Sequence, residues 1–179
     1  MKIHGSRSLK TLPGQLTRPT TARVREALFN IWQGSISGCR WLDLCAGSGA
    51  MGAEALSRGA GKVIGIEQSG KACEVIQQNW RNVADSDGKF QVLRGDAVKY
   101  VERLAGEKFD RIYFDPPYES GLYRSVLEAI VTYRLLEENG EIAVEHDPKF
   151  WTAIEIEGLT ICRQKKYGNT HLTFYRNAE

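Results

Sequence analysis

The sequence is poor in the residues that metal sites, disulfide frameworks and membrane spans require. Its 179 residues include four cysteines and three histidines, all scattered, and no Cys-x-x-Cys pair. Neither a zinc site nor a disulfide framework is therefore expected. No apolar run approaches the roughly 18 residues of a membrane span, and the N-terminal stretch lacks the apolar core of a signal peptide. We expect a cytoplasmic protein that binds no metal and no membrane.

The composition is that of a folded domain with an uneven distribution of charge. Apolar residues make up 42% and charged residues 26%, which argues against disorder. Residues 1–26 carry six Lys/Arg against one acid, residues 159–179 carry four against one, and residues 27–158 carry 14 against 20. Two basic ends on an acidic body suit a polyanionic partner. Solvated ends without a partner explain the charge about equally well.

Strand-like and helix-like segments alternate along the chain. Helices are expected over residues 20–32, 49–59, 69–84, 96–106 and 122–136, and strands over 40–47, 62–67, 90–95, 109–114 and 140–146. Two further strand-like runs within 159–176 flank Gly168-Asn169, a hairpin signal. Short connections between alternating elements predict an α/β domain with a mostly parallel, doubly wound sheet and an antiparallel hairpin at one edge. We expect one domain, residues 21–179, preceded by a basic N-terminal arm, residues 1–20.

A glycine-rich turn follows the first expected strand, where sheets of this kind bind ligands. Gly47-x-Gly49-x-x-Gly52 opens the next helix, and Glu67 lies twenty residues after Gly47 at the end of the second strand. Glycines allow a tight turn and the close approach of a ligand, and a carboxylate on the second strand can accept both ribose hydroxyls. The pattern therefore predicts a site for an adenosine-containing cofactor.

Two cofactors fit this pattern. Read literally, it is a dinucleotide motif, so an NAD-dependent oxidoreductase stays open. Asp43, four residues before Gly47, favours another cofactor, because a carboxylate beside a pyrophosphate would be repelled. S-adenosylmethionine has no phosphate and a cationic amino-acid moiety, which Asp43 would attract. A glycine turn that serves packing alone would leave Asp43 and Glu67 unexplained.

Asp96 lies at the end of the third strand and begins a helix. As an N-cap it needs no functional explanation. At this strand end, however, its carboxylate or a neighbouring backbone N–H could also meet an adenine edge. The two roles can coexist.

The fourth strand runs directly into Asp115-Pro116-Pro117-Tyr118. An exocyclic amino group of a base is a poor nucleophile, and hydrogen bonds from its protons to Asp115 and to a backbone carbonyl would draw its lone pair out of the ring plane. The prolines would hold that carbonyl rigidly, and Tyr118 could stack on a flipped-out base, a contact typically of about 1–3 kcal/mol. A stiff Asx-type turn would explain the motif in isolation. Beside a cofactor site, catalysis is the better interpretation.

Three segments together resemble one enzyme family. "DLCAGSGAMGAEALSRGA", "FDPPY" and "RPTTARVREALFNI" look like the RsmD-type 16S rRNA guanine-N2 methyltransferases, and the resemblance extends over nearly the whole chain to "KYGNTHLTFYR". The first two motifs are shared with DNA adenine and protein glutamine methyltransferases, which remain alternatives. The third makes the combination much more specific.

The resemblance implies a fold, a donor and an acceptor. The implied fold is the Rossmann-like class I S-adenosylmethionine-dependent methyltransferase fold, with a seven-stranded sheet. The donor would be S-adenosylmethionine, and the acceptor a guanine of 16S rRNA within an assembled or assembling small ribosomal subunit. A monomer without metal is expected.

The same resemblance assigns site residues by position. The cofactor-binding residues would be Asp43, Gly47, Gly49, Glu67, Asp96 and Thr20. The catalytic residues would be Asp115, Pro116, Pro117 and Tyr118. Arg18 and Arg23 would lie near the RNA entrance, and Lys165 and Lys166 of the expected hairpin are candidates for phosphate contact or for a solvated surface.

Two other features have simpler interpretations. His146, in "VEHD", suggests an acid–base group, but a lone histidine at a strand end is usually structural. Glu54 and Arg58 are spaced i,i+4 on the first helix after the glycine turn, which predicts a surface ion pair of small energy.

Overall fold

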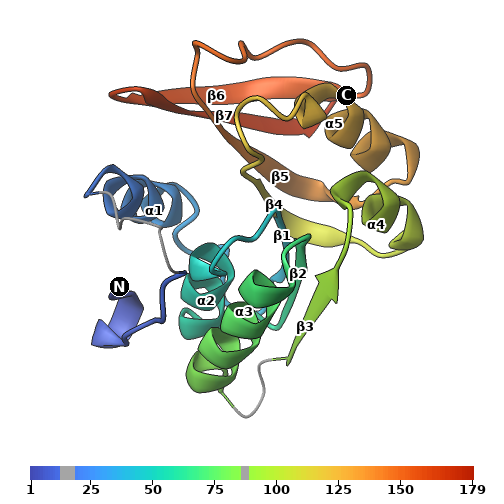
Figure 1. Cartoon of the computed structure of the whole chain (residues 1–179). Coiled ribbons are helices and arrows are strands. Elements are labelled where there is room, and N and C mark those ends of the chain that lie inside the picture. Colours follow the sequence, from blue (N-terminus) through green and yellow to red (C-terminus); the bar gives the residue numbers. More distant parts are fainter. Residues whose placement is uncertain (13–18, 86–88) are drawn as a thin grey trace.

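A seven-stranded sheet organises the structure, a computed structural model that describes residues 1–12, 19–85 and 89–179 (Figure 1). Its strands are β1 (Arg40–Leu44), β2 (Lys62–Glu67), β3 (Lys89–Arg94), β4 (Phe109–Phe114), β5 (Leu136–His146), β6 (Leu159–Tyr167) and β7 (Thr170–Asn177). The order across the sheet is β3-β2-β1-β4-β5-β7-β6. Strands β1 to β5 pair in parallel, and β7 pairs antiparallel with both β5 and β6. The predicted seven-stranded, mostly parallel sheet with a C-terminal antiparallel hairpin is confirmed.

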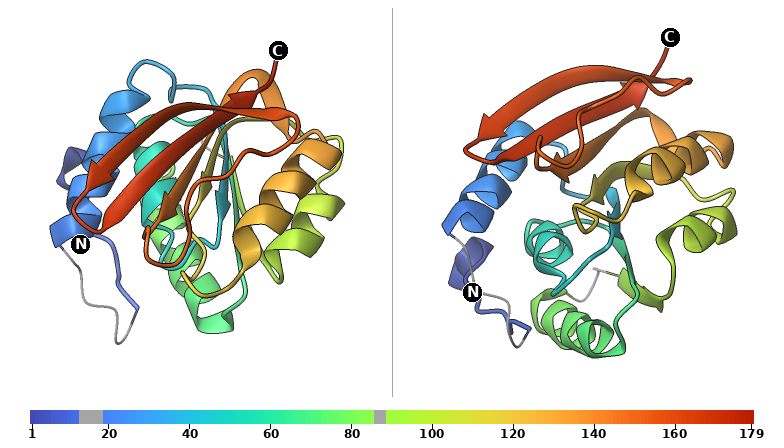
Figure 2. Two further views of the ribbon diagram at one scale, coloured as in Figure 1. Left: turned by 90° about the horizontal axis from the view of Figure 1, so that it is seen from above. Right: turned by 45° about the horizontal axis from the view of Figure 1, so that its top comes forward.

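Helices cover both faces of this sheet (Figure 2). They are η1 (His4–Ser6), α1 (Pro19–Ile31), α2 (Ala50–Ser57), α3 (Gly70–Val83), α4 (Ala97–Arg103) and α5 (Leu122–Thr132). Alternate strand residues feed two cores, as the period of a strand requires. Trp41 and Val63 pack with α1, α2 and α3, whereas Leu42 and Ile64 pack with α4 and α5.

The helix starts follow the predicted capping residues, but one helix end does not. Ser69 accepts a hydrogen bond from the Ala72 N–H (3.3 Å), and Asp96 from the Lys99 N–H (3.0 Å). The helix predicted over 122–136 ends at Thr132, because Arg134 adopts a left-handed conformation (φ 55°). Residue 136 already belongs to β5, so the last apolar residues of the predicted helix enter the sheet core.

Trp80 of α3 fills a space that glycines leave open. Its buried indole would lie 2.3 Å from a Cβ built on Gly52 and 2.5 Å from one built on Gly65. Its Nε1 donates to the Gly49 carbonyl (2.7 Å). The third glycine of the turn motif, Gly52, therefore serves helix packing and not the approach of a ligand.

The first residues of the chain lie along α2 and α3. Glu54, only 3% exposed, accepts hydrogen bonds from the His4 N–H (2.9 Å) and from Arg58. The predicted i,i+4 pair of Glu54 and Arg58 is present (3.0 Å), but Glu54 is not at the surface, because the N-terminal segment covers its carboxylate. The division into an arm (1–20) and a domain (21–179) stays a prediction.

Asn79 of α3 joins this segment to the glycine loop. Its amide Nδ2 donates to the carbonyls of Lys10 and Ser48 (3.0 Å each), and its Oδ1 accepts from the Lys10 N–H (2.8 Å). The side chain is 1% exposed. A buried, fully bonded amide fixes both segments to α3, since breaking any of these bonds would leave a buried polar group unpaired.

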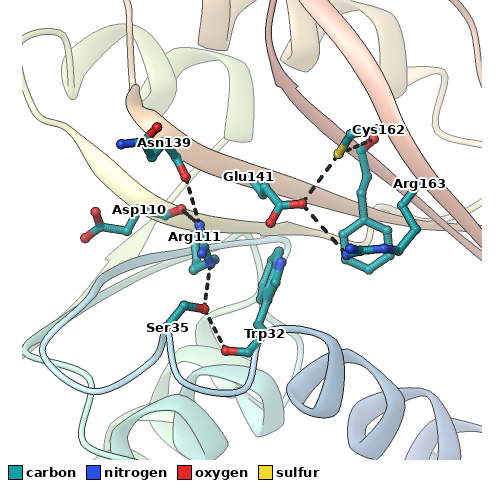
Figure 3. A network of polar contacts seen from close by, with 9 residues as sticks. Trp32, Ser35, Asp110, Arg111, Asn139, Glu141, Cys162 and Arg163 are labelled. Atoms are coloured by element: carbon teal, nitrogen blue, oxygen red, sulfur yellow. Dashed lines mark hydrogen bonds and ion pairs between the residues drawn. The ribbon is translucent and has the colours of Figure 1, made fainter.

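A polar network near the start of β4 ties the segment after α1 to the sheet (Figure 3). Arg111 Nε donates to Ser35 Oγ (3.2 Å), and the guanidinium lies over the Trp32 ring (5.3 Å). Glu141, the partner of Arg111 on β5, accepts from Cys162 Sγ (3.4 Å). These contacts anchor the end of α1.

Candidate active site

The carboxyl ends of the parallel strands surround a cleft of about 1100 Å³. The predicted site residues that line it are Arg23, Gly47, Glu67, Asp96, Asp115, Pro116, Pro117 and Tyr118. Its volume exceeds that of a pocket for one small ligand, about 300–1,000 Å³, so it can hold a nucleoside cofactor together with part of a substrate. Within the described ranges, no group of three or more His, Cys, Asp or Glu residues could hold a metal ion. No helix in the same ranges is long and apolar enough to cross a membrane.

Glu67 connects the second strand to the glycine loop. Its Oε2 accepts from the Gly47 N–H (2.8 Å), and its Oε1 accepts from the Ser69 N–H (3.2 Å). Gly47 has a left-handed conformation (φ 58°), and nothing lies within 4 Å of a Cβ built there. Each carboxylate oxygen keeps a further lone pair for a ligand hydroxyl. The loop and the acid therefore form one preorganised wall of the cleft.

Asp43 and Gly49 lie beneath this wall and do not line the cleft. Asp43 is 1% exposed, and its Oδ2 accepts from the Gly52 N–H (3.1 Å) at the start of α2. Burial raises the pKa of Asp43 well above its usual range. Its contact with a cationic cofactor group stays a prediction, whereas its contact with the helix is structural.

Asp96 combines two positions. Its carboxylate caps α4 through the Lys99 N–H, and the residue lines the cleft. Asp96 follows β3, and β2 and β1 lie between β3 and β4, the strand that precedes the Asp115–Tyr118 loop. The predicted N-cap is present, and the capping bond uses Oδ1. The other carboxylate oxygen remains a candidate acceptor for an adenine amino group.

The loop Asp115–Tyr118 is fastened at both ends. The Asp115 N–H donates to the Leu44 carbonyl of β1 (3.4 Å), and the Pro117 carbonyl accepts from the Ser120 N–H (2.9 Å). Among the described residues, no donor contacts the Pro116 carbonyl. Of the two proline carbonyls, that of Pro116 is therefore the free acceptor in the loop.

Tyr118 of this loop pairs with an aromatic ring of the segment that follows β5. Tyr118 stacks on Phe150, with ring centroids 5.8 Å apart and planes inclined by 15°. Phe150 is 48% exposed. The contact restrains Tyr118 at the rim of the cleft, where a base could stack on it.

Glu145 is a site residue that the sequence analysis missed. It lies at the end of β5, lines the cleft and accepts a hydrogen bond from the Tyr113 hydroxyl (2.7 Å). Burial first, and then the charge of Glu145, raises the pKa of Asp115 well above its usual range. The sequence signal was present, since Glu145 follows the apolar run Ile142–Val144 near the end of the strand, next to the histidine that the sequence analysis considered.

His146 is structural, as expected. Its Nδ1 contacts the Trp151 carbonyl (3.1 Å) and its Nε2 contacts Thr173 Oγ1 (2.8 Å). Burial lowers the pKa of His146 to about 4. The neutral ring therefore joins β5 to β7 and to the following loop.

The predicted substrate residues are not all in one place. The Arg23 guanidinium lies 5.7 Å from the Tyr167 ring, and both residues line the cleft. Lys165 and Lys166 are exposed on opposite faces of β6, paired with Leu172 and His171. Thr20 belongs to the first turn of α1. Arg18 lies outside the described residues.

Known proteins share this sequence and fold. The family model described as "Conserved hypothetical protein 95" matches residues 1–176. A Bacillus subtilis (strain 168) protein, YlbH, described as a candidate rRNA methyltransferase, is 37% identical over 172 residues, which are 95% of this chain and 93% of that protein. Ribosomal RNA small subunit methyltransferase D of Haemophilus influenzae is 30% identical over 172 residues, 96% of this chain and 89% of the relative.

A solved structure agrees with the sequence comparisons. The candidate methyltransferase yhhF of Escherichia coli superposes with a TM-score of 0.85 at 29% identity, and the match covers 100% of this chain and 99% of the other. The agreement extends over the whole sheet and its helices. The chain therefore belongs to the family of Conserved hypothetical protein 95, the RsmD-type rRNA methyltransferases.

Proposed function

We propose that the protein transfers a methyl group from S-adenosylmethionine to the exocyclic N2 amino group of a guanine in 16S rRNA. One observation carries the proposal: the Asp115–Tyr118 loop and the Gly47–Glu67 wall face the same cleft. The family membership supports an RNA substrate, and the relatives named small subunit methyltransferase D support the choice of ribosomal subunit. The substrate would be the assembled or assembling small subunit.

The residues present fit S-adenosylmethionine. Glu67 would accept the ribose hydroxyls, Asp96 would meet the adenine, and the backbone at Gly47 would leave room for the amino-acid moiety. Asp43 would add negative potential from below. When bound, the cofactor supplies an electrophilic methyl group attached to a sulfonium sulfur.

The DPPY loop would activate and place the acceptor nitrogen. Asp115 and the Pro116 carbonyl would accept one hydrogen bond each from the two N2 protons, which would make the nitrogen lone pair available. Tyr118 would stack on the base and hold it in the cleft. Methylation releases one proton from N2, and the raised pKa of Asp115 suits its carboxylate to receive that proton.

Arg23 and the hairpin would contact the RNA around the target base. Arg23 is exposed at the rim, and Lys165 follows the same edge on β6. Phosphate contacts of this kind add affinity and position without reading sequence. We place the enzyme in the cytoplasm as a monomer that works on the ribosomal subunit.

Methyl transfer to defined acceptors tests the proposal. The protein would be incubated with radiolabelled S-adenosylmethionine and, separately, with undermodified small subunits, free rRNA, DNA and a release-factor protein. We expect label in 16S rRNA, and mass mapping of its nucleotides should locate one N2-methylguanine. Label only in DNA or protein would contradict the RNA substrate.

Calorimetric titration tests the cofactor independently of the acceptor. We expect binding of S-adenosylmethionine and none of NAD. Binding of NAD alone would instead favour an oxidoreductase. If S-adenosylmethionine binds but Asp115→Ala leaves cellular function intact, the chain is a non-catalytic RNA-binding protein.

A further inference from the structure

The cleft contains a second carboxylate that the proposed transfer does not use. Strands β4 and β5 run parallel with Phe114 opposite Val144. The residues that follow this pair, Asp115 directly after β4 and Glu145 on β5, therefore lie at the same level, on backbones about 4.8 Å apart. Both residues line the cleft.

Glu145 is held in one orientation. The Tyr113 hydroxyl donates to its Oε2 at 2.7 Å, and both residues are buried. The Asp115 carboxyl is the other hydrogen-bond partner of Glu145. Tyr113 thus fixes one oxygen of Glu145, and the carboxylate faces Asp115 at the cleft wall, where donors of a ligand can replace the proton that the two acids share.

Two neighbouring carboxylates repel each other, so the pair is unfavourable without a ligand. Burial raises the pKa of Asp115, and the charge of the neighbouring Glu145 raises it further. Asp43 adds a further acidic group on β1, opposite Tyr113. A ligand that relieves the repulsion would present hydrogen-bond donors to both Asp115 and Glu145.

Guanine is the common nucleobase with such an edge. Its ring N1–H lies directly beside its exocyclic N2 amino group, so three N–H donors stand in a row. Adenine and cytosine place an unprotonated ring nitrogen, an acceptor, beside their amino group. If such a ring nitrogen faced the fixed carboxylate, two acceptors would face each other. Neither the ring nitrogen nor the carboxylate oxygen would then have a hydrogen-bond donor.

We propose that Glu145 selects guanine: its carboxylate accepts the hydrogen bond of guanine N1–H while Asp115 accepts from N2. Tyr113 is the positioning residue that orients Glu145. This inference rests on the proposed function and deepens it, since it assigns the choice of base to a side chain. The alternative is a structural Glu145 that serves only as the acceptor for Tyr113.

Base analogues at the target position separate these two roles. Small subunits would be reconstituted with guanine, 2-aminopurine or 6-thioguanine at the mapped nucleotide. 2-Aminopurine keeps the 2-amino group but lacks the N1–H and O6, whereas 6-thioguanine keeps the N1–H and replaces only O6. The measured quantity is kcat/KM for methyl transfer by the wild-type protein and by Glu145→Gln.

We expect the wild-type protein to prefer guanine and 6-thioguanine over 2-aminopurine by about 10- to 100-fold, the effect of one hydrogen bond to a charged group. Glu145→Gln should lose most of this preference, because its amide can donate to the bare N1 of 2-aminopurine. Tyr113→Phe keeps the carboxylate and should reduce the preference only partly. Titration with S-adenosylmethionine would verify that each variant is folded.

Two results would overturn the inference. Glu145→Gln could lower kcat/KM for all three bases by the same factor, which is the signature of a structural role. It could also retain the full preference for guanine, which would assign the choice of base to another group. If the wild-type protein methylates no guanine in any subunit, the proposed function fails as well.

Discussion

At the scale of single residues, Asp115 is held in conditions that oppose its ionised form. It lies between buried strand ends, beside Glu145 and near Asp43, and these surroundings raise its pKa well above the ordinary value of 3.8. Catalysis needs the ionised form as an acceptor, whereas folding favours the protonated form. A functional group kept against a folding preference is typical of an active site.

Asp115→Asn separates these two demands. We expect methyl transfer to fall by about 10²–10³-fold or more, because a donor-and-acceptor amide replaces a pure acceptor. Binding of S-adenosylmethionine should be largely retained. Calorimetry of the cofactor and single-turnover transfer to subunits are the two measurements. Equal losses of binding and transfer would show that Asp115 holds the cofactor instead.

The same substitution should stabilise the fold in a pH-dependent way. Because the folded-state pKa of Asp115 is raised, the folded state binds this proton more tightly than the unfolded state does. Stability is therefore lost as pH rises from about 4 through the raised pKa. Asn mimics the protonated form at every pH, so its gain, about 0.5–2 kcal/mol, should appear above that range. Urea unfolding at pH 4 and pH 8 measures it, and an equal effect at both would contradict the assignment.

Gly52 shows that a motif residue can serve packing alone. A methyl group there would meet the Trp80 ring at 2.3 Å. We expect Gly52→Ala to destabilise the protein by about 1–3 kcal/mol, as overpacking does. In a Trp80→Leu background the same change should cost much less, and chemical denaturation of the four proteins completes the cycle. Additive effects would rule out the clash.

At the scale of secondary-structure elements, α3 connects parts of the molecule that are far apart in sequence. Trp80 supports the glycine loop from below, and Asn79 ties that loop to the N-terminal segment. The hydrogen-bond partners of Asn79 are distant in sequence: Lys10 lies 69 positions away and Ser48 lies 31 positions away. The loop that would meet the cofactor is thus held from two directions by one helix.

Asn79→Ala tests this connection. The change leaves the Ser48 carbonyl and the Lys10 backbone without partners in a buried place, so we expect a loss of about 1–3 kcal/mol in unfolding free energy. A weaker affinity for S-adenosylmethionine should accompany it. Gln78→Ala is a matched control, because the neighbouring Gln78 contacts Lys10 only at the surface. Its effect should stay within about 0.5 kcal/mol, and similar losses in both variants would contradict the proposed link.

At the scale of the whole molecule, the two basic chain ends meet at one side of the cleft. Arg23, from the first helix, and Tyr167, from the last hairpin, are in contact at its rim. The strand order brings β6 and β7 to the sheet edge beyond β5, and the core of α1, α2 and α3 includes Leu172 and Phe174 of β7. A basic rim above an acidic cleft suits RNA that is held by its backbone while one base enters.

The two lysines of β6 offer a paired test of this arrangement. Lys165 stands on the face of the strand that carries Tyr167, whereas Lys166 stands on the other face. We expect Lys165→Ala to raise KM for the small subunit more than Lys166→Ala, with kcat and cofactor affinity unchanged. The Lys165 variant should also show the smaller dependence of binding on salt. The reverse order would place the RNA on the α5 side.

Much of the fold was predictable because it depends on local patterns. The spacing of apolar residues distinguishes strands from helices, and Ser69 and Asp96 mark helix starts through their own hydrogen bonds. The end of α5 was not predictable in this way. Leu135 and Leu136 continue the apolar pattern of the helix, but the left-handed turn at Arg134 ends the helix, both leucines are buried, and Leu136 pairs with Phe109 in the sheet.

The strand segments, the closing hairpin, the glycine turn and the Asp115–Tyr118 loop were predictable from the sequence alone, because each depends on residues adjacent in the chain. What surrounds these features depends on the tertiary structure. Asp115 and Glu145 are thirty positions apart, and only the register of β4 against β5 makes them neighbours. Likewise, only packing against Trp80 assigns Gly52 to the core. Contacts between distant residues arise from strand order and register, which no local pattern encodes.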